Sequence, residues 1–223
     1  MRNSIQVKGL IVTIDNAGCI GEKPADVVQV PNEVSGYFTA RTAILEQWCA
    51  GAKPIQLLLA NFSGDAAWDG YVRGMTKLFH EIGEEMPPIT GSSESNFDAL
   101  QSAMSLTMIG EPSFNTSTEG CHYFLIGEPL VGDQVVANPN KVAQLKEIYA
   151  GIKGGWIAAV WPTGSKGIGQ EITRFIGEGY TCDIDAACTA GPSTAVLVAV
   201  KEEHVQTLSK HMTAPVREII KAI

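Results

Sequence analysis

The stretch LIVTIDNAGCIGEKPAD, residues 10–26, carries the strongest fold signal in this chain. An apolar run typical of a strand ends in Asp15, and a glycine-rich turn with Glu22, Lys23 and Asp26 follows. An acid at a strand end beside flexible backbone suits a magnesium-bound phosphate. Strands also end at Asp and Gly for conformational reasons alone, so the rest of the chain has to support this interpretation.

The composition indicates a globular protein of one or two domains. The chain has 223 residues, 45% hydrophobic and 18% charged, which is enough to bury a substantial core. A formal net charge of -8 argues against a nucleic-acid partner. The apolar runs are far shorter than the roughly 20 residues of a membrane span, and the first residues lack the apolar core of a signal peptide. We therefore expect a soluble, cytoplasmic protein without a membrane partner.

The cysteines and histidines show no pattern of a metal site or a catalytic triad. No CxxC pair, no histidine at zinc-site spacing and no GxSxG motif occurs. We expect reduced, mostly buried thiols, and Cys19, within the glycine-rich turn, is the one thiol expected near a ligand. The five cysteines are Cys19, Cys49, Cys121, Cys182 and Cys188.

The first half of the chain alternates between strand and helix patterns. Asn32 is a candidate cap for a helix that stops at Gly51, and Gly83 is a candidate C-terminal cap for a second helix. The pattern predicts strands at 10–15, 55–60, 88–90 and 100–110, helices from 32 and from 65, and a turn at 91–97.

Residues 111–120 are polar and turn-forming, and they predict a linker between two domains, 1–112 and 113–223. The fold class expected is α+β, with two mixed domains in which helices cover a sheet. In the second domain the pattern predicts strands at 122–127, 156–160 and 195–200, helices at about 139–150 and 168–177, and a C-terminal helix interrupted near Pro215.

Three acids in the first domain are candidate magnesium ligands. Asp15, Glu46 and Glu94 each lie beside glycine or at the end of an apolar element. Carboxylates from separate segments, completed by phosphates and water, would make a nucleotide site. Each acid alone also fits a solvated surface position. Glu46 fits that alternative least, because the helix dipole disfavours an anion near the C-terminal end of a helix.

The glycine-rich turn PTGSKGIGQEI at 162–172 is a candidate anion site, because the backbone amides at a helix start bind anions. It matches neither the GxxxxGK[ST] pattern nor the GxGxxG pattern. Gly164, Ser165 and Lys166 are therefore assigned to contacts with substrate, with an ordinary tight turn as the alternative.

The first-domain segments together resemble the superfamily of aminoimidazole ribonucleotide synthetase, thiamine-monophosphate kinase and selenophosphate synthetase. The resemblance lies in a strand ending in Asp15, a helix with an acid before Gly-Ala-x-Pro (Glu46 to Pro54), and a loop at 91–95 before an alternating strand. Within it, the segments NAGCIGEKPADVVQVP, ITGSSESNF, PTGSKGIG and AGPSTAVL are similar to the α-ribazole kinase group.

This resemblance implies a kinase that uses ATP and Mg²⁺ to phosphorylate the 5′-hydroxyl of α-ribazole in cobamide salvage. It also implies a homodimer that joins the first-domain sheets, with the nucleotide near the subunit boundary. Asp15, Glu46 and Glu94 would hold the metal, and Asp15, Glu94 and Lys23 would act in catalysis. The remaining nucleotide contacts expected are Asn16, Gly18, Asp26, Gly91, Ser92, Ser93 and Lys53.

The chain departs from the thiamine-phosphate kinases in three places. It shows no Gly-Asp-Asp before the first strand, Lys166 replaces the acid of a Ser-Asp-Gly turn, and Gly191-Pro192-Ser193-Thr194 replaces an acidic loop. These changes favour a less anionic acceptor than thiamine phosphate. Two alternatives stay open: an ATP-dependent ring-closing ligase of the aminoimidazole ribonucleotide synthetase type, and a catalytically silent nucleotide-binding protein.

Overall fold

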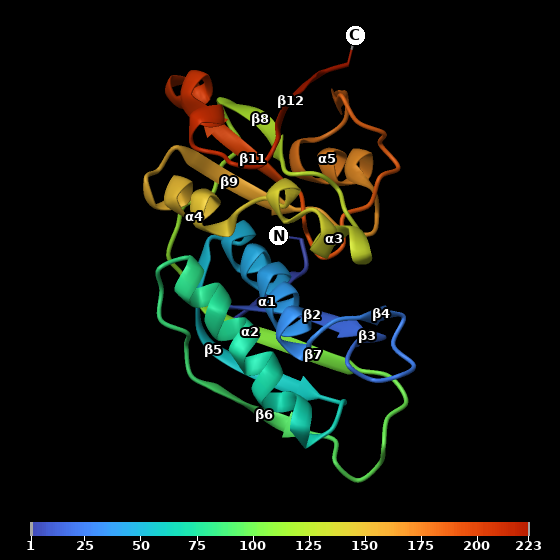
Figure 1. Cartoon of the computed structure of the whole chain (residues 1–223). Coiled ribbons are helices and arrows are strands. Elements are labelled where there is room, and N and C mark those ends of the chain that lie inside the picture. The colour runs from blue at the N-terminus through green and yellow to red at the C-terminus, as the bar shows by residue number, and fades with distance from the viewer. Residues whose placement is uncertain (1, 223) are drawn as a thin grey trace. The chain divides into compact units, whose positions relative to one another are not determined.

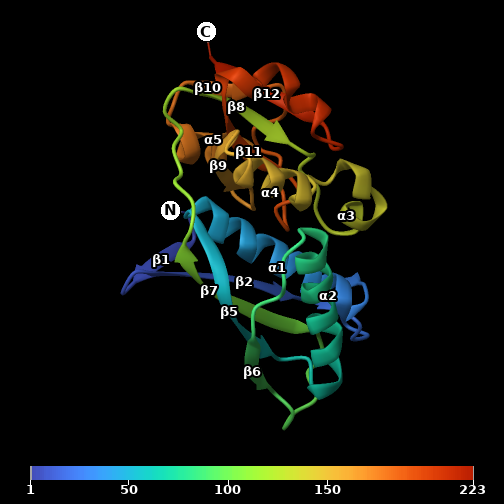
Figure 2. The same cartoon turned by 90° about the vertical axis from the view of Figure 1, so that its left-hand side faces the viewer.

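The structure is a computed structural model, and it describes residues 2–222. The chain divides into two compact units, and the division falls between Ser113 and Phe114 (Figures 1 and 2). Each unit has its own five-stranded sheet. We describe each unit by itself.

The first unit is built on a sheet with the strand order β1-β2-β7-β5-β6. Neighbouring strands are antiparallel except β5 and β6, which run parallel. A short parallel pair, β3 and β4, lies in the loop after β2. The strands are β1 (Ser4–Val7), β2 (Leu10–Gly18), β3 (Ile20–Gly21), β4 (Val28–Gln29), β5 (Ala52–Asn61), β6 (Ile89–Ser93) and β7 (Ala103–Pro112).

Two helices cover one face of this sheet: α1 (Asn32–Cys49) and α2 (Trp68–Glu81), the latter preceded by a 3₁₀ turn at Asp65–Ala67. The strands alternate as a half-covered sheet requires. In β7, Met104, Leu106 and Met108 are buried under the helices, whereas the residues between them are half-buried on the other face.

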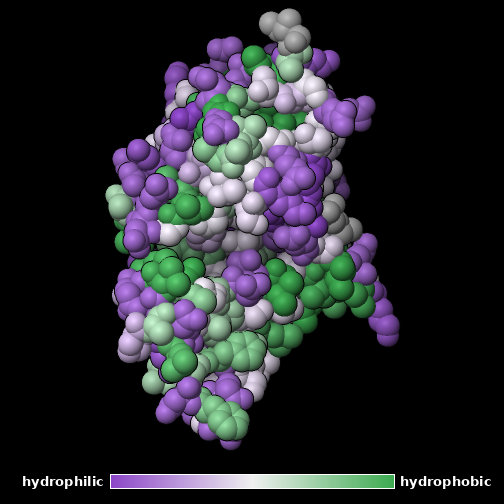
Figure 3. Space-filling view, turned by 90° about the vertical axis from the view of Figure 1, so that its right-hand side faces the viewer, coloured by the Kyte–Doolittle hydropathy of each residue, from purple (hydrophilic) through white to green (hydrophobic). Residues whose placement is uncertain are grey.

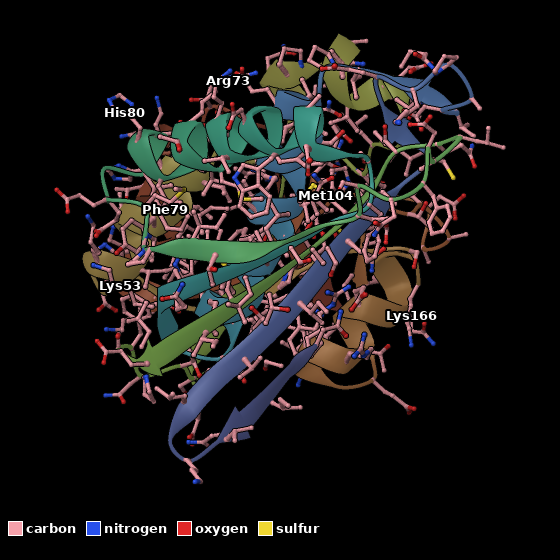
Figure 4. The ribbon with its side chains drawn as sticks, turned by 90° about the horizontal axis from the view of Figure 1, so that it is seen from below. Lys53, Arg73, Phe79, His80, Met104 and Lys166 are labelled. Carbon is pink, nitrogen blue, oxygen red and sulfur yellow. The ribbon has the colours of Figure 1, made fainter. Side chains whose placement is uncertain are left out.

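Glycines allow α1 and α2 to touch backbone to backbone. A Cβ added at Gly36 would lie 2.4 Å from the Tyr71 carbonyl oxygen, and one at Gly74 would lie 2.0 Å from the Glu33 carbonyl oxygen. Only glycine permits this approach. In Figure 4, Phe79 of α2 points toward the sheet, while Arg73 and His80 point away from it.

The second unit contains an antiparallel sheet with the strand order β10-β12-β8-β11-β9. Strand β11, which lies between β8 and β9, is buried from Val196 to Val200, which explains its unbroken apolar sequence. The elements are β8 (Cys121–Ile126), α3 (Asp133–Ala137), a 3₁₀ turn at Pro139–Lys141, α4 (Leu145–Lys153), β9 (Ile157–Pro162), α5 (Ile168–Ile176), β10 (Tyr180–Cys182), β11 (Val196–Lys201), a 3₁₀ segment at Glu202–Lys210 and β12 (Val216–Lys221).

The mixed α/β fold class predicted from the sequence is confirmed, with helices packed on a sheet in each unit. Gly83 follows α2 at a φ of 73°, in the left-handed conformation that a C-terminal cap requires. The described residues contain no helix that is long and apolar enough to cross a membrane. All five cysteines are free, as expected, but only Cys182 is fully buried and the other four are half-buried.

Several predicted boundaries are wrong. Strand β2 does not end at Asp15 but continues to Gly18, because β7 pairs with it along its whole length. The turn predicted at 91–97 begins later in the structure, because Gly91 to Ser93 belong to β6. Asn32 is the first residue of α1, and Pro31 precedes the helix without a side-chain cap.

The second unit differs most from prediction near its ends. The predicted helix at 139–150 is a 3₁₀ turn followed by α4, which begins only at Leu145. The predicted C-terminal helix is a 3₁₀ segment and, after Pro215, the strand β12. Pairing of β12 with β8 supplies the backbone hydrogen bonds there, so the tertiary partner decides the local structure.

Candidate nucleotide site

Asp15 is a largely buried acid on the helix-covered face of the first sheet. It follows Ile11 and Thr13 in the alternation of β2, so its side chain points toward α1 and lies next to Thr42. Burial raises the pKa of Asp15 from 3.8 to about 7, and hydrogen bonds from the Asn16 backbone and from Thr42 offset only part of this. A bound cation would favour the ionised form of this carboxylate.

Glu46 lies close enough to Asp15 to help raise its pKa. Its carboxylate is fully buried and forms an ion pair with Arg2. The backbone amide and the side-chain amide of Asn3 also donate to it, each at 3.2 Å. Arg2 and Asn3 therefore compensate the negative charge that Glu46 places near the C-terminal end of α1. A metal ion could bind Glu46 only if Arg2 moved.

Glu94 lies apart from Asp15. Residue 15 is level with Leu106, Leu59 and Gly91 on the next three strands. Glu94 therefore lies three strands across, about 14 Å at ~4.8 Å per strand, and three residues, roughly 10 Å, further along. Its carboxylate accepts the Asn96 amide at 2.7 Å. Within residues 2–222, no three His, Cys, Asp or Glu side chains gather to hold a metal ion.

Asp26 organises the glycine-rich loop. This buried acid accepts the Lys23 amide at 2.9 Å and the Ser102 amide at 2.6 Å. Glu22, from the same loop, accepts the amide of Asn32 at the start of α1 at 2.8 Å. The two acids therefore hold the backbone in place, and they fix the Lys23 backbone beside the start of β7.

Strand β6 offers backbone donors at the edge of the sheet. Leu57 donates to the Pro88 oxygen and Glu94 donates to the Asn61 oxygen. In a parallel ladder this register directs the amides of Thr90, Ser92 and Glu94 to β5 and those of Gly91 and Ser93 outward. Gly91 and Ser93 can thus donate to an anion, whereas the Ser92 amide is used within the sheet.

The other predicted nucleotide contacts are dispersed. Asn16 points to the face opposite Asp15 because strand side chains alternate. Gly18 pairs with Ala103 at the end of β2. Lys53, at the far end of β5, forms a 2.6 Å ion pair with Glu84. These three residues do not converge with Asp15 within the unit.

The turn before α5 is not a free anion cradle. The amides of Ile168 and Gly169 donate to the carbonyl oxygens of Cys188 and Ala186, at 2.9 and 3.0 Å. The backbone amides at the start of α5 thus already have partners within the chain, which matches the alternative of an ordinary tight turn. Ser165 and Lys166 are exposed and Gly164 is half-buried, so the two side chains face solvent.

Sequence reasoning missed a set of buried polar residues around the loop of Asp26. Three of them are Asn or Ser residues at strand ends, where these residue types are ordinary turn formers. The fourth is a tyrosine that fits the apolar face of α2. Their burial in a polar network is a tertiary property. The residues are Asn61, Ser63, Tyr71 and Ser102.

Comparison with solved structures identifies the fold. Over 99% of this chain and 87% of the other, it matches the HypE–HypF complex with a TM-score of 0.61 at 14% identity. Thiamine monophosphate kinase from Aquifex aeolicus matches with a TM-score of 0.62 at 11% identity, over 98% and 87% of the two chains. The chain has the aminoimidazole ribonucleotide synthetase-like fold.

PurL from T. maritima in complex with AMPPCP shares this fold, with a TM-score of 0.56 at 13% identity over 98% of this chain and 42% of PurL. Among the similar structures, HypE has been solved with ATP and the Aquifex kinase with AMPPCP and TMP. No protein-family model and no curated protein matches the chain. At these identities the likeness establishes the fold alone.

Proposed function

We propose that the chain is an ATP- and Mg²⁺-dependent small-molecule kinase, which transfers the γ-phosphoryl group to the 5′-hydroxyl of α-ribazole. The observation that carries the proposal is Asp15, a buried carboxylate on a fold that in other proteins binds ATP or AMPPCP. Burying this acid is unfavourable unless a cation or a proton compensates. A magnesium nucleotide supplies the cation.

The donor groups present fit magnesium only with help from the nucleotide. Mg²⁺ commonly uses one or two carboxylates and completes its octahedron with phosphate oxygens and water. Asp15 would supply one ligand, Glu46 would supply a second only if Arg2 moved away from it, and Glu94 stays a predicted ligand. Bound metal would neutralise charge on the phosphates.

The chain's own contribution to phosphoryl transfer is positioning and charge neutralisation. The outward amides of Gly91 and Ser93 would donate to phosphate oxygens. Lys23, on the loop that Asp26 holds, would offset charge on the transferred group. Asn16, Gly18, Ser92 and Lys53 stay predictions without a common location in the unit.

The acceptor assignment is supported by the likeness of four sequence segments to the α-ribazole kinase group. Gly164, Ser165 and Lys166 of the second unit remain the proposed substrate contacts, through exposed side chains rather than the helix amides. A cationic lysine in place of an acid suits an acceptor without a positive charge. The location in the cytoplasm stays a prediction.

We further propose that the chain forms a homodimer through the uncovered face of the first sheet. Ile5 is 62% exposed and Ile14 55% exposed on that face, together with Val7 and Leu58. Figure 3 shows hydrophobic side chains gathered along the arm that β1 and β2 form. Such a patch commonly marks a protein interface, and a second copy of the face is self-complementary.

The test is to incubate the protein with ATP, Mg²⁺ and α-ribazole and to search for the phosphorylated acceptor by mass spectrometry. Asp15→Asn and Glu94→Gln are expected to lose turnover at least about 100-fold while keeping the fold, with Glu119→Gln, an exposed acid outside the site, as the control. Full activity of both variants would sink the magnesium assignment.

Other outcomes separate the alternatives. Release of free phosphate without a phosphorylated acceptor would support the ring-closing ligase. Stabilisation by Mg-ATP without turnover of any acceptor would support the silent nucleotide-binding protein, because a ligand that binds only the folded state raises its stability. Neither product nor stabilisation would overturn the nucleotide proposal as a whole.

A further inference from the structure

A row of buried polar groups crosses the first unit near the ends of β5 and β6 and the start of β7. It starts at β6, passes the loop after β5 and the first turn of α2, and reaches the glycine-rich loop through the residue before β7. Except for Ser93 at its start, every member is at least nine-tenths buried. The members are Ser93, Asn61, Ser63, Tyr71, Ser102 and Asp26.

The half of the row next to β6 is a closed set of hydrogen bonds. The Asn61 side-chain amide donates to the Ser93 hydroxyl at 2.9 Å and to the Gly64 oxygen at 2.8 Å. Its carbonyl oxygen accepts the Ser63 amide at 2.9 Å. The Asn61 backbone oxygen accepts the Glu94 amide at 2.8 Å. Asn61 therefore fixes the end of β6 and the position of Glu94.

The other half fixes the glycine-rich loop. Asp26 accepts the amides of Ser102 and Lys23 with its two oxygens. The Gln101 side chain adds a 2.7 Å bond to the Ala25 oxygen and reaches Cys19 Sγ at 3.4 Å. The loop is thus attached to the two residues that lead into β7.

Tyr71 reaches both halves through Ser63, which bonds Asn61 on one side and the backbone of Ala103, next to Ser102, on the other. Its hydroxyl lies 2.7 Å from the Ser63 hydroxyl, which itself bonds the backbone of Ala103. Ser102 and Asp26 lie near enough to influence the pKa of Tyr71, which burial raises above its usual value. The ring rises from α2 and is completely buried.

We propose that the Tyr71 hydroxyl is a positioning group that sets the spacing between the two nucleotide-binding segments, 22–26 and 91–94. The inference rests on the proposed nucleotide function. Neither segment holds the other directly, and a connected, buried network is stronger than its separate pairs. Misplacement of a binding group by about 1 Å costs on the order of 100-fold in rate, so one hydroxyl far from the chemistry is expected to affect it.

The experiment compares Tyr71→Phe with Tyr37→Phe. Tyr37 is the matched control, because its hydroxyl also bonds a side chain, Glu81 at 2.7 Å, but on the outer part of the helix pair and outside the network. We expect Tyr71→Phe to weaken Mg-ATP binding about tenfold and Tyr37→Phe to leave it unchanged. Calorimetric titration of the full chain with Mg-ATP measures both.

A second measurement uses the protein without ligand. Amide hydrogen exchange at Lys23 and Glu94 reports the two segments separately, because each amide donates to a member of the network or its backbone. Tyr71→Phe should accelerate exchange at both amides together, about tenfold, and Tyr37→Phe at neither. Ser63→Ala removes the same link together with the bonds to the Ala103 backbone, so Tyr71→Phe should add nothing further in the Ser63→Ala background.

The outcomes distinguish this inference from the proposed function. If the wild-type chain binds Mg-ATP and Tyr71→Phe binds it equally well, the positioning role is refuted while the nucleotide function stands. If exchange at Lys23 is unaffected by Tyr71→Phe and by Ser63→Ala, the two segments are not coupled and the inference fails. If the wild-type chain does not bind Mg-ATP, both proposals fall.

Discussion

At the scale of single residues, the first unit places two acids in surroundings that disfavour charge. Asp15 is held on the covered face of β2, and Glu46 is compensated by Arg2 and Asn3. A folded protein tolerates such groups only with partners or at a cost in stability. Asp15 has the weaker compensation, because hydrogen bonds from Asn16 and Thr42 do not restore its ordinary pKa.

The free energy of unfolding of the ligand-free protein is expected to fall as pH rises from 4 to 7. The pKa of Asp15 is about 7 in the folded protein, against an ordinary value of 3.8 once the chain unfolds, so the folded state holds the extra proton in this window. The stabilisation by this proton is complete below the unfolded pKa of 3.8 and is lost as the pH rises to the folded pKa of about 7. The total loss is at most about 4 kcal/mol, at ~1.4 kcal/mol per pKa unit. Urea unfolding at a series of pH values measures it.

Asp15→Asn is the matching variant, since the amide keeps the shape and cannot ionise. It should remove most of this slope and make the ligand-free protein more stable than the wild type at alkaline pH. A slope that persists unchanged in Asp15→Asn would assign the pH dependence to other groups.

At the scale of elements, α1 and α2 pack closely against each other. Gly36 and Gly74 let the two backbones meet. Beside them Arg41 is completely buried, and burial lowers its pKa while Tyr37 and Glu81 act in the opposite direction. The helix pair therefore combines tight contact with a buried charge.

Gly74→Ala is expected to destabilise the protein by about 3 kcal/mol, because its Cβ would meet the Glu33 backbone at 2.0 Å and backbone cannot move aside easily. Gly18→Ala is the control, since nothing lies within 4 Å of an added Cβ there, and it should stay within about 0.5 kcal/mol of wild type. Thermal and urea unfolding measure both. Equal stability of the two variants would refute the close helix crossing.

Glu81→Gln is expected to cost about 3 kcal/mol, because it leaves the charge of the completely buried Arg41 less compensated. Glu81 accepts the Tyr37 hydroxyl and acts on Arg41 across the helix pair. Glu85→Gln, an exposed acid just beyond α2, should change the free energy of unfolding little. A Glu81→Gln variant as stable as Glu85→Gln would show that Arg41 does not depend on this carboxylate.

At the scale of the whole molecule, one face of the first sheet carries apolar side chains without cover from α1 or α2. An open sheet of this kind usually has one polar face. Here Ile5, Val7 and Ile14 lie on it, which is the basis of the proposed homodimer.

Ile14→Lys is expected to dissociate the dimer, because it places a charge in the centre of the proposed interface. Ile220→Lys is the matched control, as Ile220 is also an exposed strand isoleucine, 53% against 55% for Ile14, but in the second unit. Sedimentation at micromolar concentrations reads out the mass. A monomeric wild-type chain, or dissociation by Ile220→Lys alone, would contradict the proposed interface.

Much of the fold could be predicted from the sequence, because the spacing of apolar residues reports which face of an element is buried, and glycine and proline mark where elements end. The strand at 55–60, the helix from 65 with its Gly83 cap and the helix at 168–177 follow patterns that local chemistry fixes. The end of β2 and the C-terminal β12 could not be predicted, since their backbone hydrogen bonds come from β7 and β8, distant in sequence.

The candidate site follows the same division. Sequence alone determined which acids and glycines lie at the ends of elements. The spacing of apolar residues along strands and helices determined that helices pack on a sheet. Only the tertiary structure decided that Glu46 is paired with Arg2, that Glu94 lies three strands from Asp15, and that Tyr71 bonds Ser63 while Asp26 holds the amide of Ser102. The physical reason is that apolar burial is encoded residue by residue, whereas the pairing of polar groups depends on which distant segments share the same space.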